Sequence, residues 1–323
     1  MQRRTAIRWS LAATAAAALP AWAQTGFPDR PIKILQGFAP GGNADTIARL
    51  VGTEMGKSLG QSFVVEAVTG AGGNIAAERV ARARPDGYTL LLATGGHAVA
   101  GAIYNKLSYR TVEDFEMVST ITYFPFLIVV PADSPFQSLG ALLNEARSKP
   151  KAIGYGSAGI GTGHHLAGEL LAKMARADLL HVPYRGDAAS ITAVLGGEVP
   201  CVIAPPTAVL PQIKAGKLRA LAVTGPQRWP VLPDTPTVAE QGVAQYDVRS
   251  WAGVMAPAGT PRAIVNQLSE EVRKALQLPA VRARLEEMGG DVRASTPEEM
   301  KAMVTSQLQR WVQLVAEANI AKQ

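Results

Sequence analysis

Short apolar segments alternate with amphipathic helical patterns along most of the chain. Residues 32–38, 62–68 and 88–94 have the length and composition of β-strands. Between the first two, residues 44–59 place apolar side chains at helical spacing, and a helix is also expected after each of the other two strands. Strands separated by helix-length segments form βαβ units, so this part of the chain predicts an α/β lobe with a parallel sheet.

A second α/β series follows an interruption at residues 126–136. Helical patterns at residues 163–175, 188–197 and 208–216 separate four further apolar segments. The strands expected there are 152–158, 179–186, 200–206 and 218–225. The sequence therefore predicts two α/β lobes.

The C-terminal part is expected to be helical. Thr260 followed by Pro261 predicts an N-cap with proline at the first helical position. Thr296, followed by Pro297 and three residues later by Glu299, predicts a capping box. These helices are too few for a third domain and need a sheet on which to pack.

The simplest solution returns the chain to the first lobe. The first lobe is then built from two segments and the second from one, and the chain crosses between them near 125 and near 248. Two crossings make a hinge, and a cleft between lobes is a preferred ligand site. The predicted segments are 24–125 with 249–323 for the first lobe, and 126–248 for the second.

Residues 1–23 have the pattern of a secretory signal peptide. Arginines near the start form a positive region, residues 11–19 are an apolar core too short to span a bilayer, and residues 21–23 fit a cleavage site. We therefore expect export to the periplasm, by the general or the twin-arginine route.

Charge and cysteine content exclude several classes of protein. The formal charge is +6, and removing the three arginines of the signal peptide leaves 29 basic against 26 acidic residues, or +3. This balance is too mild to predict nucleic-acid binding. Cys201 is the single cysteine and has apolar neighbours, so we expect a buried thiol and no internal disulfide.

A glycine turn stands between the first strand and the first helix. Gly41 and Gly42 lie where helical N–H groups lack intrahelical partners, and glycine lets a ligand approach the backbone closely. Asp45 in the first turn complements the helix dipole and is a candidate cap. With no Lys or Arg in the turn, the pattern favours a carboxylate held by backbone groups; a purely structural turn is the alternative.

The second lobe has a counterpart after its first strand, in the stretch Tyr-Gly-Ser-Ala-Gly-Ile-Gly-Thr-Gly. Ser157 and Thr162 offer hydroxyls there, and Gly159 and Gly161 expose the backbone. Two such loops, one in each lobe, suggest a pair of surfaces that close on a small anion.

Other chemistries fit these residues poorly. Residues 154–159 match a dinucleotide-binding glycine pattern, but Asp178 precedes the next strand instead of following it. A hydrolase elbow fails because Tyr155 stands two residues before Ser157. The four histidines lack metal-ligand spacing, so no metal is expected. No acid/base pair or activated nucleophile emerges, so neither a cofactor nor catalysis is expected. A hydrolase that pairs Ser157 with His164 or His165 is the enzyme alternative.

Three further side chains are candidates on less evidence. His97 follows a strand and is expected either to face the cleft or to be solvated at a helix start. His165 is expected either to orient the second loop or to pack beneath it. Arg185 is expected either to meet a second carboxylate or to be solvated.

Seven stretches in order resemble the extracytoplasmic solute receptors of tripartite tricarboxylate transporters, also known as Bug (Bordetella uptake gene) receptors. The resemblance covers nearly the whole chain after the signal peptide, and the stretches include the two glycine loops. Their sequences are FPDRPIKIL…FAPGGNADTIAR, GAGGNIAAERVARARPDGYTLLLAT, IGYGSAGIGTGHHLAGELL, HVPYRG, IKAGKLRALAVTG, LPDTPTVAEQG and APAGTP.

The resemblance implies a two-lobed periplasmic binding protein of the Venus flytrap, type 2-like kind, with mixed, mainly parallel sheets flanked by helices. It also implies a monomer that closes on a small aromatic, di- or tricarboxylic acid and delivers it to membrane permease subunits. A role in ligand sensing or partner binding for a signalling system is the alternative. The candidate ligand-binding residues are Phe38, Ala39, Gly41, Gly42, Asn43, Thr94, His97, Ser157, Gly161, Thr162, His165 and Arg185.

Two departures from the family pattern concern ligand identity. Pro200 occupies a position where the family usually has aspartate, and Gly101-Ala102 replaces a common Asn-Pro pair. We expect both segments to shape the far end of the pocket without affecting the two glycine loops. Loss of the acidic group argues against amino acids as ligands, because an ammonium group needs a counter-charge.

Overall fold

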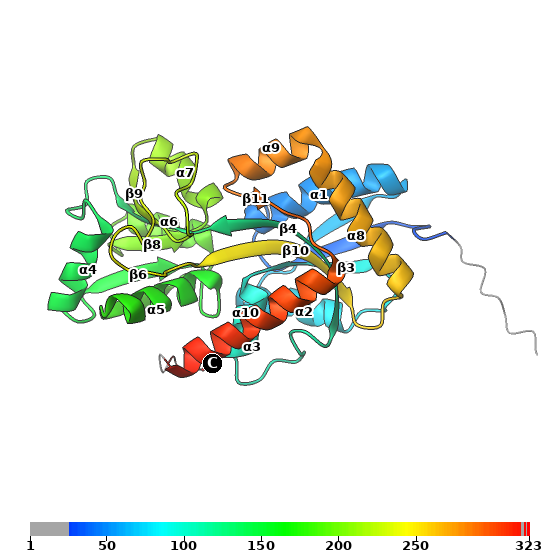
Figure 1. Cartoon of the computed structure of the whole chain (residues 1–323), viewed down its shortest axis with the longest axis horizontal. Coiled ribbons are helices and arrows are strands. Elements are labelled where there is room, and N and C mark those ends of the chain that lie inside the picture. The colour runs from blue at the N-terminus through cyan, green and yellow to red at the C-terminus, as the bar shows by residue number, and fades with distance from the viewer. Residues whose placement is uncertain (1–25, 318–319, 321) are drawn as a thin grey trace, which may run out of the picture.

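Two mixed β-sheets, each flanked by helices, form the two lobes of the molecule (Figure 1). The computed structural model describes residues 26–317, 320 and 322–323, so the predicted signal peptide lies outside the described residues. In Figure 1 the second sheet and its helices lie at the left, the first sheet lies at the right, and the long strands β4 and β10 run toward the junction. The predicted two-lobed α/β fold is confirmed.

The first sheet has the strand order β11-β4-β10-β3-β1-β2. Its strands are β1 (Ile32–Gln36), β2 (Phe63–Ala67), β3 (Thr89–Thr94), β4 (Phe115–Pro125), β10 (Arg249–Pro257) and β11 (Asp291–Val292). Its helices are α1 (Asn43–Leu59), the 3-10 turn η1 (Ala71–Gly73), α2 (Asn74–Ala81), α3 (Gly96–Ile103), α8 (Arg262–Gln277), α9 (Pro279–Glu287) and α10 (Pro297–Glu317). The C-terminal helices α8 and α10 both pack against β4.

The second sheet has the strand order β7-β6-β8-β5-β9. Its strands are β5 (Leu127–Pro131), β6 (Ile153–Ser157), β7 (Leu179–Pro183), β8 (Cys201–Ala204) and β9 (Leu218–Val223). Its helices are α4 (Leu139–Ser148), α5 (Gly163–Ala175), α6 (Asp187–Leu195) and α7 (Pro206–Lys214). In the described part of the chain, no helix has the length and apolar character needed to cross a membrane.

The two sheets share one plan. In each, three parallel strands are followed by an antiparallel strand that has just arrived from the other sheet. That strand is β10 in the first sheet, between β3 and β4, and β5 in the second, between β8 and β9. The carboxyl ends of the parallel strands in each sheet therefore lie at one edge, which is where ligands bind in open α/β sheets.

Thr224 connects the two segments that pass between the sheets. Its fully buried Oγ1 accepts a hydrogen bond from the Phe126 N–H at 2.7 Å and donates one to the Val248 carbonyl at 2.7 Å. Its backbone N–H and C=O bond the same two residues, at 3.0 and 2.9 Å. Thr224 thus holds the two crossing segments at a fixed distance from each other.

We expect Thr224→Val to lower the free energy of unfolding by about 1–3 kcal/mol, because it leaves a buried N–H and a buried carbonyl without the hydroxyl. Urea denaturation measures this loss. Thr224→Ser keeps the hydroxyl and is the matched control, with a smaller loss expected. A valine variant as stable as the wild type would show that the hydroxyl does not stabilise the crossing.

The longest strand of the first sheet, β4, was not predicted. Ser119, Thr120 and Thr122 interrupt its apolar pattern, yet all three are buried. Ser119 Oγ donates to the Ser295 carbonyl at 2.9 Å, and Thr120 Oγ1 donates to the Arg293 carbonyl at 2.8 Å. These hydroxyls bind a segment far away in the chain, so no local pattern indicates their burial.

The two predicted helix starts have different outcomes. The capping box is confirmed, since Thr296 Oγ1 accepts from the Glu299 N–H at 3.1 Å and the Glu299 carboxylate accepts from the Thr296 N–H at 2.8 Å. The predicted cap at Thr260 is wrong. Pro261 is the N-cap of α8, and the Thr260 hydroxyl donates to the Pro257 carbonyl at 2.8 Å, which closes the preceding turn.

The predicted burial of Cys201 is confirmed. Its thiol is free, and the residue is 2% exposed inside the second sheet. Burial raises the pKa of the Cys201 thiol to about 12, which leaves it protonated and unreactive at neutral pH.

Candidate functional site

The first glycine loop, residues 37–43, is held by a buried carboxylate. Asp45 Oδ2 accepts a hydrogen bond from the Gly41 N–H at 3.0 Å, and Arg49 binds both carboxylate oxygens at 2.9 and 3.1 Å. Burial raises the pKa of Asp45, but the hydrogen bonds from Arg49 and Gly41 outweigh it and the pKa is lowered. Asp45 therefore organises the loop that precedes α1 and is not a side-chain cap of the helix.

The N-terminus of α1 keeps unpaired backbone donors. Gly42 is the N-cap and supplies no side chain, and the N–H groups of Asn43 and Ala44 have no hydrogen-bond acceptor among the described residues. Ala39 and Gly41 are exposed beside them. Free N–H groups at the positive end of a helix dipole form a site for an anion.

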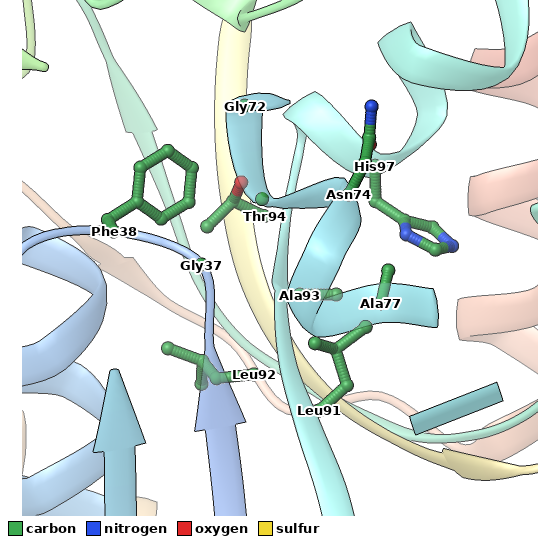
Figure 2. A pocket seen from close by; sticks show the side chains of 11 residues that line it. Gly37, Phe38, Gly72, Asn74, Ala77, Leu91, Leu92, Ala93, Thr94 and His97 are labelled. Carbon is green, nitrogen blue, oxygen red and sulfur yellow. The ribbon is translucent and has the colours of Figure 1, made fainter. Parts of the chain in front are cut away.

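A small cavity lies at the carboxyl ends of β1 and β3, with a volume of about 20 Å³. Figure 2 shows the side chains of Phe38, Thr94 and His97 around it. It has room for about one water molecule, and a carboxylic acid is too large for it. The lining residues are Gly37, Phe38, Gly72, Gly73, Asn74, Ala77, Leu91, Leu92, Ala93, Thr94 and His97.

His97 is a packed residue at the wall of this cavity. Its Nε2 lies 2.8 Å from the Thr111 carbonyl, so Nε2 carries the proton and Nδ1 is an acceptor. The ring stacks on Tyr109 and meets Phe115 edge-on. Burial lowers the pKa of His97 to about 4, which makes it neutral at physiological pH.

The second glycine loop, residues 157–162, is held by its own hydroxyls. Ser157 is fully buried, and its Oγ lies 2.7 Å from His181 Nε2 and accepts from the Gly159 N–H at 3.1 Å. Thr162 Oγ1 donates to the Gly159 carbonyl at 2.7 Å and accepts from the His165 N–H at 3.4 Å. Thr162 is the N-cap of α5, so the loop ends at a helix N-terminus as the first loop does.

Two stacked imidazoles lie beneath this loop. The rings of His165 and His181 are 4.0 Å apart, and His165 Nδ1 accepts from the Gly161 N–H at 3.4 Å. Burial lowers the pKa of His165 to about 4, and burial together with His165 lowers that of His181 to about 3. Neutral imidazoles thus support the loop. The sequence did not indicate the role of His181, because 24 residues separate it from Ser157.

A third glycine loop, residues 70–73, lies between the other two and was not predicted as part of the site. Its Gly73 packs directly against Gly37, and its Gly72 faces Ile160 in the second lobe. The Tyr104 ring at the end of α3 lies against Gly161. The three loops therefore meet where the lobes touch, and the only sequence signal was a further run of glycines before a helix.

Other candidates lie away from this meeting point or are packed. Arg185 is exposed and makes no hydrogen bond or ion pair with any described residue. Pro200 precedes β8, at the opposite end of that strand from the edge that carries the second loop, and Ala102 is buried in α3. The expectation that the two family departures shape the pocket stays a prediction, since Gly101-Ala102 lies just before Tyr104, whose ring lies against Gly161. Across the described residues, no cluster of metal-ligating side chains occurs.

The buried histidines predict acid sensitivity. Burial lowers the pKa of His97 to about 4, against about 6.5 in an unfolded chain. Between these values the unfolded state binds more protons, so the free energy of unfolding should fall as pH decreases from about 6.5 toward 4. Urea midpoints at pH 8 and pH 5 test this.

The control isolates His97 from other groups. Burial raises the pKa of Glu169 and Asp187, and these carboxyls change stability in the opposite direction. We therefore compare the wild type with His97→Gln, whose amide replaces the donor without titrating. Equal pH dependence in the two proteins would contradict the prediction.

Comparison with known proteins gives one family. The model of the tripartite tricarboxylate transporter family receptor matches residues 47–320. The chain is 34% identical to the periplasmic binding protein BugD, with a TM-score of 0.86, covering 92% of this chain and 100% of BugD.

Two further solved structures are similar and hold acids. R. palustris Rpa4515 with adipate is 35% identical, with a TM-score of 0.87, covering 92% of this chain and 100% of that one. MatC from Rhodopseudomonas palustris with bound malate is 34% identical, with a TM-score of 0.84, covering 90% and 100%. The matches extend over both sheets and confirm the resemblance seen in the sequence. The chain belongs to the tripartite tricarboxylate transporter family of receptors, together with the Bug proteins.

Proposed function

We propose that the protein is a solute receptor that binds one small carboxylate between its two lobes. The observation that carries this proposal is the pair of glycine loops at the carboxyl ends of β1 and β6, each leading into a helix N-terminus. The N–H groups of Asn43 and Ala44 at the first loop are uncharged donors without an acceptor among the described residues, and each good hydrogen bond to a charged group contributes about 1.5–3 kcal/mol. The candidate ligand contacts are the residues named from the sequence, with Arg185 the least supported because of its exposure.

The class of ligand is inferred from the family. The adipate and malate found with two solved relatives are both dicarboxylic acids, and the backbone donors here suit the same carboxylate group. Aromatic and tricarboxylic acids carry this group as well. The first loop and the second loop would then each approach one side of the ligand.

Closure of the lobes is the proposed mechanism. The first lobe would move against the second about the crossing segments that Thr224 connects. The first lobe comprises residues 24–125 with 249–323, and the second comprises residues 126–248. Contacts already join the lobes, including an ion pair of 3.1 Å between Lys173 and Glu317. A ligand that binds only the closed form shifts the equilibrium toward it, and the closed surface is what a permease would recognise.

The proposed location and partners of the protein follow from its family and from the pattern of residues 1–23. After removal of residues 1–23, the receptor would work as a monomer in the periplasm and deliver its solute to the membrane subunits of a tripartite transporter. The periplasmic description of BugD supports this location.

Hydrolysis is a second candidate because Ser157 and His181 form a close pair, 2.7 Å apart. We propose binding without catalysis, for two reasons. His181, with a pKa lowered to about 3, is a poor general base at neutral pH, and no described acid orients its other nitrogen. Ester turnover that disappears in Ser157→Ala would overturn this choice.

Thermal unfolding of the purified protein, refolded to remove bound solute, tests the proposal. The panel contains mono-, di-, tri- and aromatic carboxylates. A true ligand at 100 times its dissociation constant adds about 2.7 kcal/mol, which raises the melting temperature by a few degrees for a chain of this size. A flat response from a folded protein would refute carboxylate binding.

A further inference from the structure

Polar side chains without hydrogen-bond partners are concentrated at the edge of the second sheet that is formed by the carboxyl ends of its parallel strands. Among the residues that the structure describes, six buried side-chain atoms lack a hydrogen-bond partner. Four of them belong to this edge: both ring nitrogens of His164, Oδ1 of Asp187 and Oγ1 of Thr207. His164 is 8% exposed, and its Nε2 lies 3.3 Å from Asp187 Oδ1 without the alignment of a hydrogen bond.

These three residues come from different helices that begin at the same edge. His164 is in the first turn of α5, Asp187 is the first residue of α6, and Thr207 is the second residue of α7. The strand order reverses between the neighbours β6 and β8, so the helices that follow these two strands, α5 and α7, leave the sheet on opposite faces, and their apolar side chains belong to separate core clusters. Such a divergence of helices is the preferred ligand position in an open α/β sheet.

The first lobe and the crossing segments cover this edge. The Phe126 ring, between β4 and β5, lies 4.5 Å from the His164 ring. Pro206, at the start of α7, faces Gly289 of the first lobe, where an added Cβ would approach to 2.7 Å. His164, which directly follows the second glycine loop, and the start of α7 therefore lie against the crossing segment and the first lobe, whereas the Asp187 side chain beside His164 is 28% exposed.

The chemistry of the set differs from that of the glycine loops. Burial lowers the pKa of His164, so its imidazole is neutral and offers one donor and one acceptor. Asp187 is acceptor-only when ionised, and a carboxylate placed against it would be repelled. Leaving such buried groups unpaired is unfavourable, because they lose their hydrogen bonds to water without gaining others. A ligand group that donates hydrogen bonds satisfies them, whereas a second carboxylate does not.

We propose that His164, Asp187 and Thr207 form a specificity subsite for a hydrogen-bond donor, a hydroxyl or an ammonium group, on the carboxylate ligand. This inference rests on the proposed function, since the glycine loops hold the carboxylate and the subsite reads the other end. Under this proposal Asp187, beside His164, supplies an acidic group, so amino acids stay among the candidate ligands despite the missing aspartate at position 200.

Matched acids test the subsite by titration calorimetry. The pairs are succinate with malate, adipate with 3-hydroxyadipate, and benzoate with 4-hydroxybenzoate, and aspartate is the ammonium partner of succinate. In at least one set the donor-bearing acid should bind the wild type about tenfold or more tightly than its unsubstituted partner. Comparing the affinities for malate and aspartate shows whether the subsite prefers a hydroxyl or an ammonium group.

Three variants connect the preference to these residues. Each variant should reduce the ratio between the affinity for the donor-bearing acid and the affinity for its unsubstituted partner. The variants are Asp187→Ala, His164→Phe and the nearly isosteric Thr207→Val, and for Asp187→Ala the ratio should fall to about twofold. Asp178→Ala, an exposed acid before β7, is the control and should keep the ratio. Circular dichroism shows that each variant is folded, and Thr207→Val remains informative if a larger change unfolds the protein.

The outcomes separate this subsite from the proposed function. Binding of unsubstituted acids with no preference for donor-bearing ones overturns the subsite alone. A preference that survives in all three variants also overturns it. If no acid of any set binds, the carboxylate receptor and its subsite fail together.

Discussion

Gly161→Ala is expected to weaken carboxylate binding by about tenfold or more. Gly161 has φ +75°, where an L side chain is strained by about 1–3 kcal/mol. Its added Cβ would also lie 2.7 Å from Cε2 of Tyr104 in the first lobe. This clash is relieved when the lobes separate, so the substitution opposes closure and with it ligand binding. Titration calorimetry of the two proteins measures the effect.

Gly197→Ala is a matched control for backbone strain. Gly197 also has φ +75°, but an added Cβ would have no atom within 4 Å. Both variants should lose stability because of the strained backbone. Only Gly161→Ala should also bind the carboxylate more weakly than the wild type. Equal affinities in the two variants would contradict a role for the contact between Tyr104 and Gly161 in closure.

Gly37→Ala is expected to lower the free energy of unfolding by at least about 1–3 kcal/mol and to abolish binding. Its added Cβ would lie 2.2 Å from the Gly73 Cα, a backbone atom that cannot rotate away. Relief requires displacement of the third glycine loop, which carries Gly72 next to Ile160. One methyl group would therefore disturb all three loops of the candidate site.

Urea denaturation and calorimetry measure the two effects of Gly37→Ala. The control is Gly140→Ala in α4, where the nearest atom to an added Cβ is 3.8 Å away, and alanine favours a helix. The control should be as stable as the wild type or slightly more stable. A Gly37→Ala protein with normal stability and affinity would show that the first and third loops are not held rigidly.

Local patterns were sufficient for most of the fold. Helix α5 spans Gly163–Ala175, the range that its apolar spacing predicted, because amphipathic spacing and a threonine cap both lie within the segment. Strand β4 was missed because its buried hydroxyls bond to residues 291–295, which no local pattern indicates. Thr260 was misread for a similar reason, since its hydroxyl closes a turn before the helix begins.

Only the backbone part of the candidate site could be predicted from the sequence. Glycines before a helix start can be read from sequence, and both glycine loops lie at helix N-termini. Side-chain partners could not be read in the same way. Ser157 with His181 and His164 with Asp187 come together only because β6 lies beside β7 and the helices after them begin at one edge. Topology, not spacing, determines those pairs.

Titration calorimetry of the purified protein with di-, tri- and aromatic carboxylic acids tests the central claim most directly. We predict that at least one acid among malate, succinate, adipate, citrate and benzoate binds with one site per chain. Its heat-capacity change should be negative, as burial of apolar surface on lobe closure requires. A folded protein that gives no binding heat with any of these acids at several temperatures would contradict the account.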